Sequence, residues 1–356
     1  MLAHTQFIQQ WIHLHDRCTG TLTYCSNSQN KITFFIIFFF PKIVTSRVAD
    51  FHETESNATV TTTADKATSI TSKPFIYLTQ TEQCLPRHLA SSTSFGNSKI
   101  CNCDVIVLSY KRECQGKKPS HISYVFAKKS TWTTGRNLLY FLAIERIRHY
   151  HYYIFLDDDV DLRLNSFSSK EMKRLAPFRA FEQWLLDDEP ALGVVNYNNN
   201  GKMLLERRQV ICSINESSVV VPVMWFDALF NAFHYKSIQH ILPLPTKFDK
   251  ESWCTSQLHV IYSAELIFRG QELEYVGITA YNRQHRPYPR APFSARVPAI
   301  IEGIQNKAPT VYQNHTLFKT LKTSQLQSYS MNTATYCMNK THRHPIVPYS
   351  HFEEQN

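Results

Sequence analysis

The segment HYYIFLDDDV, residues 151–160, joins an apolar run directly to three adjacent carboxylates, and Asp161 follows one residue later. A short continuous apolar run is typical of a strand that is buried on both faces. Adjacent carboxylates repel one another unless a cation lies among them. The segment therefore predicts a buried strand that ends either in a solvated acidic turn or at a hard metal ion.

Strand-like and helix-like patterns alternate on both sides of this segment. Strand patterns cover 103–110, 121–127, 151–160, 191–198, 219–230 and 273–283, and helix patterns cover 134–149, 174–188 and 252–270. For the first helix, Thr134 is available as an N-cap. Continuous apolar strands that alternate with helices predict an α/β fold, a Rossmann-like and mostly parallel sheet flanked by helices. The part from residue 219 onward is expected to form a second half that faces the substrate.

The charge and the cysteines exclude two classes of protein. The net charge is +9, but the longest basic runs are pairs such as Lys117-Lys118, so the sequence has no basic stripe for nucleic acid. Among nine cysteines there is no CxxC pair with zinc spacing. Cysteines between 84 and 114 predict disulfides in an oxidising compartment, with the pairing left open.

The composition divides the chain into four parts. Residues 1–44 form a tail with a short apolar segment, 32–40, closed by Pro41 and Lys42, and 45–75 form a Ser/Thr-rich stalk. A segment of nine residues suits a signal or signal-anchor better than a spanning helix, although a buried strand or a mis-started chain is the alternative. Residues 76–310 are expected to be the catalytic domain, and 311–356 a polar extension of loops.

Glycosylation acceptors and the order of these segments favour the secretory pathway. Four N-x-S/T acceptors, at Asn57, Asn215, Asn314 and Asn339, follow the apolar segment. A membrane segment, a stalk and a globular body are the layout of a type II protein. We therefore expect the Golgi or ER lumen, with the chain either anchored through its N-terminal segment or secreted.

The acidic run is placed where α/β proteins bind ligands. Open α/β sheets bind at the carboxyl ends of their strands, and a D-x-D sequence there puts its first and third carboxylates on one side of the chain. Oxygen ligands select Mn²⁺ or Mg²⁺ over softer metals, and such sites commonly share the ion with substrate phosphates. The run therefore predicts a metal site that holds a diphosphate.

Residues 101–290 resemble GT-A-fold glycosyltransferases, the nucleotide-sugar-dependent class with a D-x-D motif, and within it uncharacterised animal proteins of the secretory pathway. The resemblance rests on TWTTGRNLLY (131–140), followed after 16 residues by DDDVD. It implies that Arg136 and Asn137 approach the donor at the start of a helix. It also implies that Asp159 is the direct metal ligand, with Asp157 as a second ligand or ribose contact. Asp158 is expected to touch the ribose or sugar, and Asp161 is surplus to the motif.

The second half is expected to supply the acceptor site and, for an inverting enzyme, a general base. Asp249 and Glu251 precede Trp253, which is suited to stacking on a sugar ring, and Asp227 is the rival base. The alternative is that these acids lie at helix N-termini, where acids are common. His285 is the candidate for a further metal ligand.

The sequence as a whole predicts a hexosyl- or N-acetylhexosaminyl-transferase. It would move a sugar from a metal-bound nucleotide diphosphate sugar to a hydroxyl of a glycan or glycoprotein. Two alternatives stay open: a catalytically silent glycan-binding protein on the same fold, and a haloacid-dehalogenase-like phosphatase. The phosphatase fits less well, because its D-x-D strand normally opens the domain, whereas two strands and a helix come first here.

Overall fold

The computed structural model describes residues 73–308, with gaps at 117, 147–148, 198–218, 224–225, 269–270 and 284–292. Its strands are β1 (Phe75–Thr81), β2 (Cys103–Ser109), β3 (Ile122–Phe126), β4 (Tyr152–Asp157), β5 (Val160–Leu164), β6 (Leu192–Tyr197), β7 (Val220–Pro222), β8 (Phe230–His234) and β9 (Glu272–Asn282). Its α-helices are α3 (Trp132–Ile144), α4 (Pro177–Asp188), α6 (Tyr235–Ile241), α7 (Cys254–Ile267) and α8 (Val297–Lys307). Two short 3₁₀ helices are η1 (Met172–Arg174) and η3 (Phe293–Arg296).

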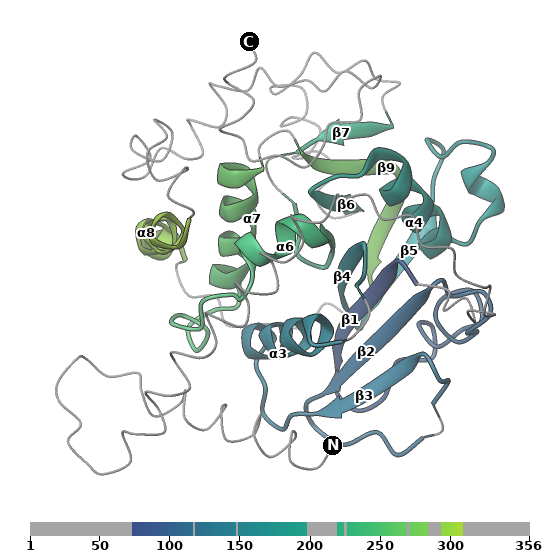
Figure 1. Cartoon of the computed structure of the whole chain (residues 1–356), viewed down its shortest axis with the longest axis horizontal. Helices are drawn as coiled ribbons and strands as arrows, with labels where there is room; N and C mark the ends of the chain where they lie inside the picture. Colours follow the sequence, from purple (N-terminus) through teal and green to yellow (C-terminus); the bar gives the residue numbers. More distant parts are fainter. Residues whose placement is uncertain are drawn as a thin grey trace, which may run out of the picture. The chain divides into compact units, whose positions relative to one another are not determined.

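All nine strands belong to one sheet (Figure 1). Their order is β3-β2-β1-β4-β8-β6-β9-β5, and β7 pairs with β9 off this path. The first four strands are mutually parallel, β8 is antiparallel to both β4 and β6, and β6 runs parallel to β9. Strands β5 and β7 run antiparallel to β9. The predicted α/β sheet flanked by helices is confirmed, and each of its antiparallel pairs includes β8 or β9, which lie in the second half.

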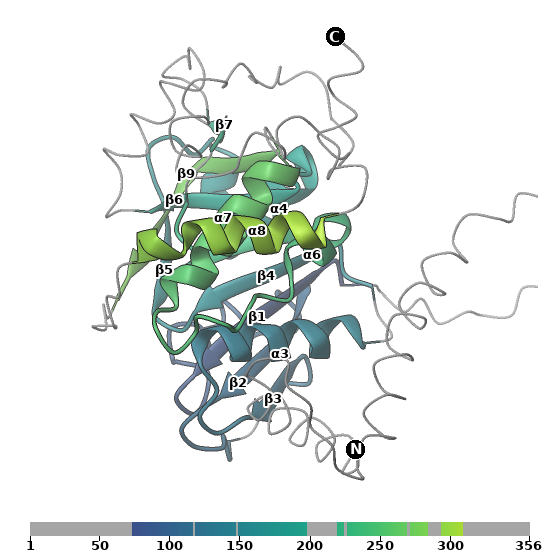
Figure 2. The ribbon, with the colours of Figure 1, turned by 90° about the vertical axis from the view of Figure 1, so that its left-hand side faces the viewer.

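Helices cover both faces of the sheet. Along β1, Phe75 and Tyr77 face a core that also contains Phe178, Phe181 and Trp184 of α4. Helix α3 packs on the opposite face, against β1 and β2, and α6 and α7 lie on the same side as α3 (Figures 1 and 2). Successive side chains of a strand point to opposite faces, so burial on both explains why these strands read as continuous apolar runs.

Several sequence predictions need correction. Helix α3 begins before the predicted N-cap: Thr131 is the cap, and it forms a capping box in which Thr134 supplies the second hydroxyl. The helix predicted from residue 174 begins at Pro177, because η1 precedes it and proline favours the first helical turn. The strand predicted over 219–230 is much shorter: only β7 lies within it, and Phe230 at its end is the first residue of β8. Strands β1, β5 and β8 and helices α6 and α8 were not predicted.

The terminal predictions lie outside the described residues. The apolar segment 32–40, the stalk up to residue 72 and the extension 311–356 belong to parts of the chain that the structure does not describe. Between residues 73 and 308, outside the gaps given above, no helix is long and apolar enough to cross a bilayer.

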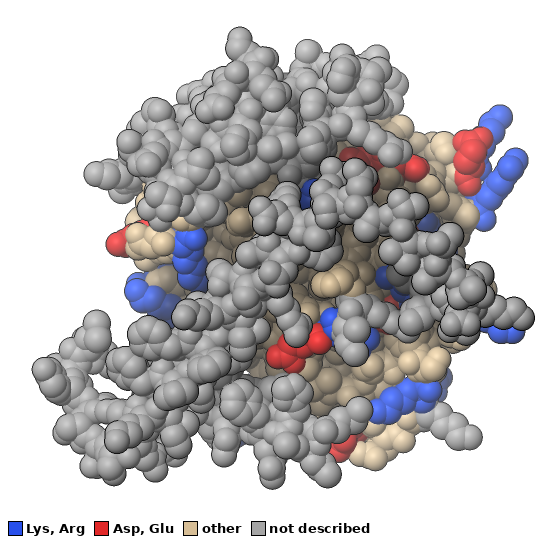
Figure 3. Space-filling model, in the orientation of Figure 1, with Lys and Arg blue, Asp and Glu red and all other residues tan. Residues whose placement is uncertain are grey.

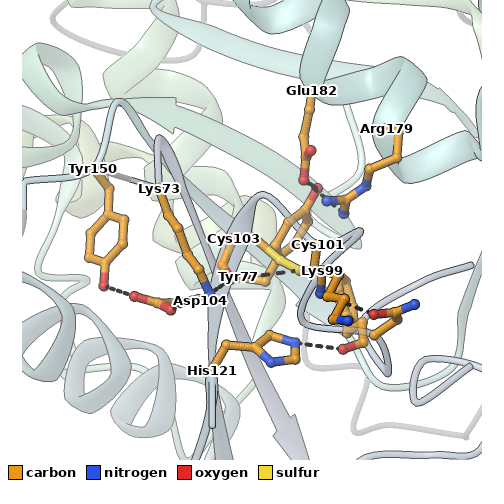
Figure 4. Close-up of a disulfide and its surroundings, with 12 residues drawn as sticks. Lys73, Tyr77, Lys99, Cys101, Cys103, Asp104, His121, Tyr150, Arg179 and Glu182 are labelled. Carbon is orange, nitrogen blue, oxygen red and sulfur yellow. Dashed lines mark hydrogen bonds and ion pairs between the residues drawn. A yellow bond between two sulfur atoms is a disulfide. The ribbon is translucent and has the colours of Figure 1, made fainter. Parts of the chain in front are cut away.

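Two disulfides confirm the prediction for residues 84–114. They join Cys84 to Cys114 and Cys101 to Cys103. The second lies close to a buried polar group on the α4 side (Figure 4). There Tyr77 donates a hydrogen bond of 2.9 Å to Glu182, whose carboxylate also pairs with Arg179 at 2.8 Å. Burial raises the pKa of Glu182 to about 7, although Arg179 and Tyr77 oppose the shift.

Charged side chains are interspersed on the visible face of the described residues. In Figure 3, Lys and Arg side chains alternate with Asp and Glu and do not gather into an extended basic surface on this face.

The buried His234 makes the stability of the fold dependent on pH. It is the N-cap of α6, where Nδ1 accepts a hydrogen bond from the Lys236 amide at 3.3 Å. Burial, the neighbouring His151 and Lys236 together lower the pKa of His234 to about 3. Below the ordinary histidine pKa of about 6.5 the unfolded chain therefore binds a proton that the native protein does not. The contribution of neutral His234 to the stability of the fold is therefore complete above pH 6.5, and it is lost as the pH falls towards 3.

We expect the free energy of unfolding to fall by up to about 1.4 kcal/mol per pH unit for this group between pH 6 and 4. His259, whose pKa burial lowers to about 4, adds a similar dependence. The variant His234→Asn keeps a capping acceptor and should flatten the curve by about one proton. Urea unfolding across this range checks the slope, with the exposed His149→Asn as the control. An unchanged slope in His234→Asn would contradict the assignment.

Candidate functional site

The acidic segment lies at a topological switch point of the sheet. Strand β1 lies between β2 and β4, and the chain passes from β3 through α3 back across β1 to β4. At the carboxyl ends of β1 and β4, Gln80 of β1 is in register with Asp157 of β4. Ligands of open α/β sheets bind where the strand order reverses in this way. The sequence prediction placed Asp157 at a strand end, and the structure adds Gln80 as its neighbour on β1. We call the switch point formed by these two strand ends and the start of α3 the crevice.

The first turn of α3 lies tightly against this crevice. Gln80 Nε2 donates a hydrogen bond of 2.9 Å to the carbonyl of Thr131, the residue that caps the helix. A Cβ on Gly135 would lie 1.9 Å from Gln80 Nε2 and 2.8 Å from Leu108 Cδ2. Glycine at this position therefore lets the helix approach the strands while Gln80 and Leu108 keep their places. The approach brings the positive end of the helix dipole to the switch point, where it favours an anion.

Arg136 connects three elements around the crevice. Its side chain is buried, and Nη2 donates to Asp157 Oδ1 and to the carbonyl of Ala228, both at 2.9 Å. Its guanidinium carbon lies 3.9 Å from the ring centroid of Trp132. Burial lowers the pKa of Arg136, and the charges of Asp157 and Asp227 counteract this, so the guanidinium stays protonated.

The guanidinium is not the sole donor to Asp157. Trp132 Nε1 points to the same Asp157 oxygen at 3.4 Å, and the Asp157 amide donates to the carbonyl of Leu229 at 2.9 Å. These contacts hold the Asp157 carboxylate in one orientation.

The next two carboxylates occupy the turn between β4 and β5. Asp158 and Asp159 are half-buried there, and the carbonyl of Asp159 accepts a hydrogen bond from the Arg283 amide at 2.9 Å. Asp161 lies on β5 and pairs with Arg163 at 2.9 Å and with Arg283 at 3.5 Å. The structure thus keeps the three aspartates of the motif at the crevice and gives the surplus Asp161 an arginine environment of its own.

Asn137 does not share the environment of Arg136. Its amide donates to the carbonyl of Leu244 at 2.8 Å and accepts from the Leu244 amide at 2.7 Å, and the side chain is buried. Both polar ends of the side chain are therefore committed to the backbone before α7. This pairing favours a role in fixing that segment to α3, in place of the donor contact that the sequence predicted.

The candidate bases lie in different surroundings. Asp249 accepts a hydrogen bond from the hydroxyl of Thr131, so the structure brings it to the start of α3 beside the crevice. Glu251 forms a bidentate pair with Arg296 at 2.8 and 3.1 Å. Asp227 accepts from the Leu229 amide at 2.8 Å and caps its own turn. Of the three, Asp249 is joined to the residue that precedes Trp132.

A divalent cation fits this site only in part. The three aspartates of the turn supply carboxylate oxygens, the donors that Mn²⁺ and Mg²⁺ prefer. Within the described residues, however, no group of three or more His, Cys, Asp or Glu side chains is arranged to hold a metal by itself. His285, the predicted further ligand, lies outside those residues. The site fits an ion that draws part of its coordination shell from a bound phosphate.

Three residues of the crevice were not predicted from sequence. Thr131 and Trp132 lie in the quoted TWTTGRN segment, but the sequence did not indicate their contacts. Trp132 contacts Asp157 of β4, and Thr131 contacts Asp249 in the segment before α7. Gln80 lies on the strand that the sequence pattern missed. A polar residue at the end of an apolar run, as in FIYLTQT (75–81), is the signal that would have indicated Gln80.

Comparisons with known proteins give little further information. No protein-family model matches the chain. No curated protein matches it. Among solved structures it is similar to the crystal structure of S. aureus TarS 1–349 in complex with UDP, with a TM-score of 0.31 and 9% sequence identity. That similarity covers 72% of this chain and 75% of the other. We base the functional proposal on the residues of the crevice and not on this similarity.

Proposed function

We propose that this chain is a glycosyltransferase that uses a nucleotide diphosphate sugar and a divalent cation. The observation that carries the proposal is the position of the Asp157–Asp159 turn. It lies at the switch point of the sheet, beside the positive end of α3 and the buried Arg136. Carboxylates there cannot bind a diphosphate directly, because like charges repel. A cation between the two makes the acidic turn and the helix end parts of one site.

Each residue of the crevice has a role in this proposal. Asp159 is the direct ligand of the cation, Asp157 is the second ligand, and Asp158 contacts the ribose or sugar. The ion, Mn²⁺ or Mg²⁺, would take up negative charge on the departing diphosphate. Arg136 fixes the orientation of Asp157. His285 stays a candidate for a further ligand.

The reaction exchanges one bond to the anomeric carbon for another. In the inverting case, Asp249 takes the proton of the acceptor hydroxyl as its oxygen forms a bond to the anomeric carbon. The bond from that carbon to the diphosphate oxygen breaks, and the nucleoside diphosphate leaves with the bonding electrons. Asp249 is preferred over Glu251 because Thr131 holds it at the crevice, whereas Glu251 is paired with Arg296.

The proposed location is the lumen of the secretory pathway. It is supported by the two disulfides, since such bonds persist in oxidising compartments, and by the four N-x-S/T acceptors. Removal of N-glycans from the expressed full chain should increase its mobility on a gel. A chain without glycans would count against this location.

The donor site is tested by thermal unfolding of the full chain with nucleoside diphosphates and Mn²⁺, separately and together. We expect the melting temperature to rise only when both are present, because a ligand that binds the native state alone stabilises it by about 2.7 kcal/mol at 100 times its Kd. Uridine, guanosine, cytidine and adenosine diphosphates are compared, and the most effective one indicates the donor class.

The matched variants are Asp159→Asn and Asp161→Asn, which remove one charge each from the same acidic run. Asp159→Asn is expected to abolish the joint stabilisation and to leave the melting temperature of the ligand-free protein nearly unchanged. Asp161→Asn should keep the joint stabilisation, because that carboxylate pairs with Arg163 and Arg283. Equal stabilisation of Asp159→Asn and the parent chain, or none with any nucleotide, would reject the donor site.

A further inference from the structure

Two tryptophans from distant parts of the chain meet beside the crevice. Trp132 is the first residue of α3 and Trp253 is the N-cap of α7. Their ring centroids are 5.7 Å apart with an interplanar angle of 39°, and both side chains are half-buried. Indoles that pack together and keep part of their surface exposed form a rigid apolar platform at low entropic cost.

The tryptophan pair lies between two carboxylates with different proposed roles. Asp157 belongs to the donor site, and Asp249 is the proposed base for the acceptor. Trp132 Nε1 is 3.4 Å from Asp157 at the donor side. Its neighbour Thr131 donates a hydrogen bond to Asp249, the proposed base. An acceptor hydroxyl that loses its proton to Asp249 and attacks a sugar held at Asp157 must lie across the start of α3. The ring that bears this hydroxyl then passes over the tryptophan pair.

The segment that carries Trp253 is held at several points. Asp249 is bonded to Thr131, Glu251 is paired with Arg296, and the hydroxyls of Thr133 and Ser256 are 2.7 Å apart. Contacts of this kind fix the orientation of an aromatic ring before a ligand arrives, which reduces the entropy lost on binding.

We infer that Trp132 and Trp253 form a binding platform for a pyranose ring of the acceptor, an uncharged hexose or N-acetylhexosamine. The C–H face of such a ring is apolar and packs on an indole, while its hydroxyls remain available to Asp249. The guanidinium of Arg136 stacks on Trp132 and fixes that ring, so Trp253 makes the direct sugar contact. This inference rests on the proposed function, and it names the acceptor class of the same site.

The experiment compares Trp253→Leu, which removes the aromatic ring, with Trp253→Phe, which keeps one. The full chain is titrated with methyl glycosides of glucose, galactose, mannose, N-acetylglucosamine and N-acetylgalactosamine, in the presence and absence of Mn²⁺ and the stabilising nucleotide. Binding is followed by saturation-transfer NMR. We expect the parent chain to bind at least one glycoside. Trp253→Leu should weaken that affinity by about tenfold or more, the order expected from loss of one aromatic contact, and Trp253→Phe should retain most of it.

The nucleotide measurement separates the two proposals. Stabilisation by nucleotide with Mn²⁺ should be the same in both variants and in the parent chain. Equal glycoside affinity in Trp253→Leu and the parent chain, or no glycoside bound by the parent chain, overturns the platform. A loss of nucleotide affinity in Trp253→Leu overturns it as well, because the ring would then serve the base of the nucleotide. Glycoside binding that depends on Trp253, without any nucleotide binding, supports the platform and rejects the transferase.

Discussion

The variant Arg136→Met is expected to lower the free energy of unfolding by about 3 kcal/mol. Loss of one partner from a buried, hydrogen-bonded ion pair costs about 3–5 kcal/mol, and the carbonyl of Ala228 also loses its donor. We take the lower end because the Asp157 side chain is 34% exposed, so water screens part of the charge that is left behind. Methionine keeps the apolar stem of the side chain, which limits the effect of lost packing.

The matched control is Arg163→Met, which removes an arginine from the exposed pair with Asp161. Exposed pairs contribute about 0–1 kcal/mol, so this variant should unfold nearly as the parent chain does in urea. The conservative Arg136→Lys is expected to lose part of the stability too, because an ammonium lacks the planar fork of the guanidinium. If Arg136→Met and Arg163→Met were equally stable, the guanidinium would not be the link between the three elements.

The second large effect is expected from removal of the Cys84–Cys114 disulfide. This bond closes a loop with a sequence separation of 30 residues. Loss of a cross-link of that length costs about 3.6 kcal/mol in the chain-entropy model. For a domain of this size the double variant Cys84→Ser/Cys114→Ser should therefore melt roughly 10 °C lower.

The position of the bond extends the effect to the crevice. Cys84 follows β1 and Cys114 follows β2, so the bond ties together two loops at the carboxyl edge where Gln80 and Asp157 meet. We expect nucleotide affinity to fall together with stability. Cys254→Ser is the control, because Cys254 is a free thiol. If a reducing agent lowered the melting temperature of the double variant as much as that of the parent chain, the assigned contribution of this bond would be wrong.

The sequence predicted the elements that are encoded locally. Strands β2 and β4 contain the continuous apolar runs VIVL and YYIFL, and such runs indicate strands without knowledge of their partners. Strand β8 has the sequence FNAFH, in which Asn231 and His234 are polar and buried. The side-chain nitrogen of Asn231 donates hydrogen bonds to the carbonyls of Asp227 and Phe230. Only the folded structure supplies the partners that allow polar residues in a central strand, so the pattern did not predict it.

The candidate site was predicted to a similar extent. The position of Asp157 at a strand end follows from the order of apolar and acidic residues. Its pairing with Arg136 does not follow from spacing, because it depends on how closely α3 packs on β1 and β2, where Gly135 lies against Gln80 and Leu108. The contact between Thr131 and Asp249 joins residues 118 positions apart. The partners of Asn137 and Glu251 are Leu244 and Arg296. Both are remote in sequence, so the sequence pattern did not indicate these contacts.

The antiparallel insertion of β8 has a consequence for the growing polypeptide. When β4 leaves the ribosome, its partner β1 is already present, but its other neighbour lies about 70 residues downstream. At 5–20 residues per second, β4 stays an unpaired edge for roughly ten seconds, and unpaired edges are templates for association with other chains. During that interval Arg136 also lacks the Ala228 carbonyl, because the acceptor is 92 positions away. Early association of nascent chains is therefore most damaging at the strand that carries the acidic turn.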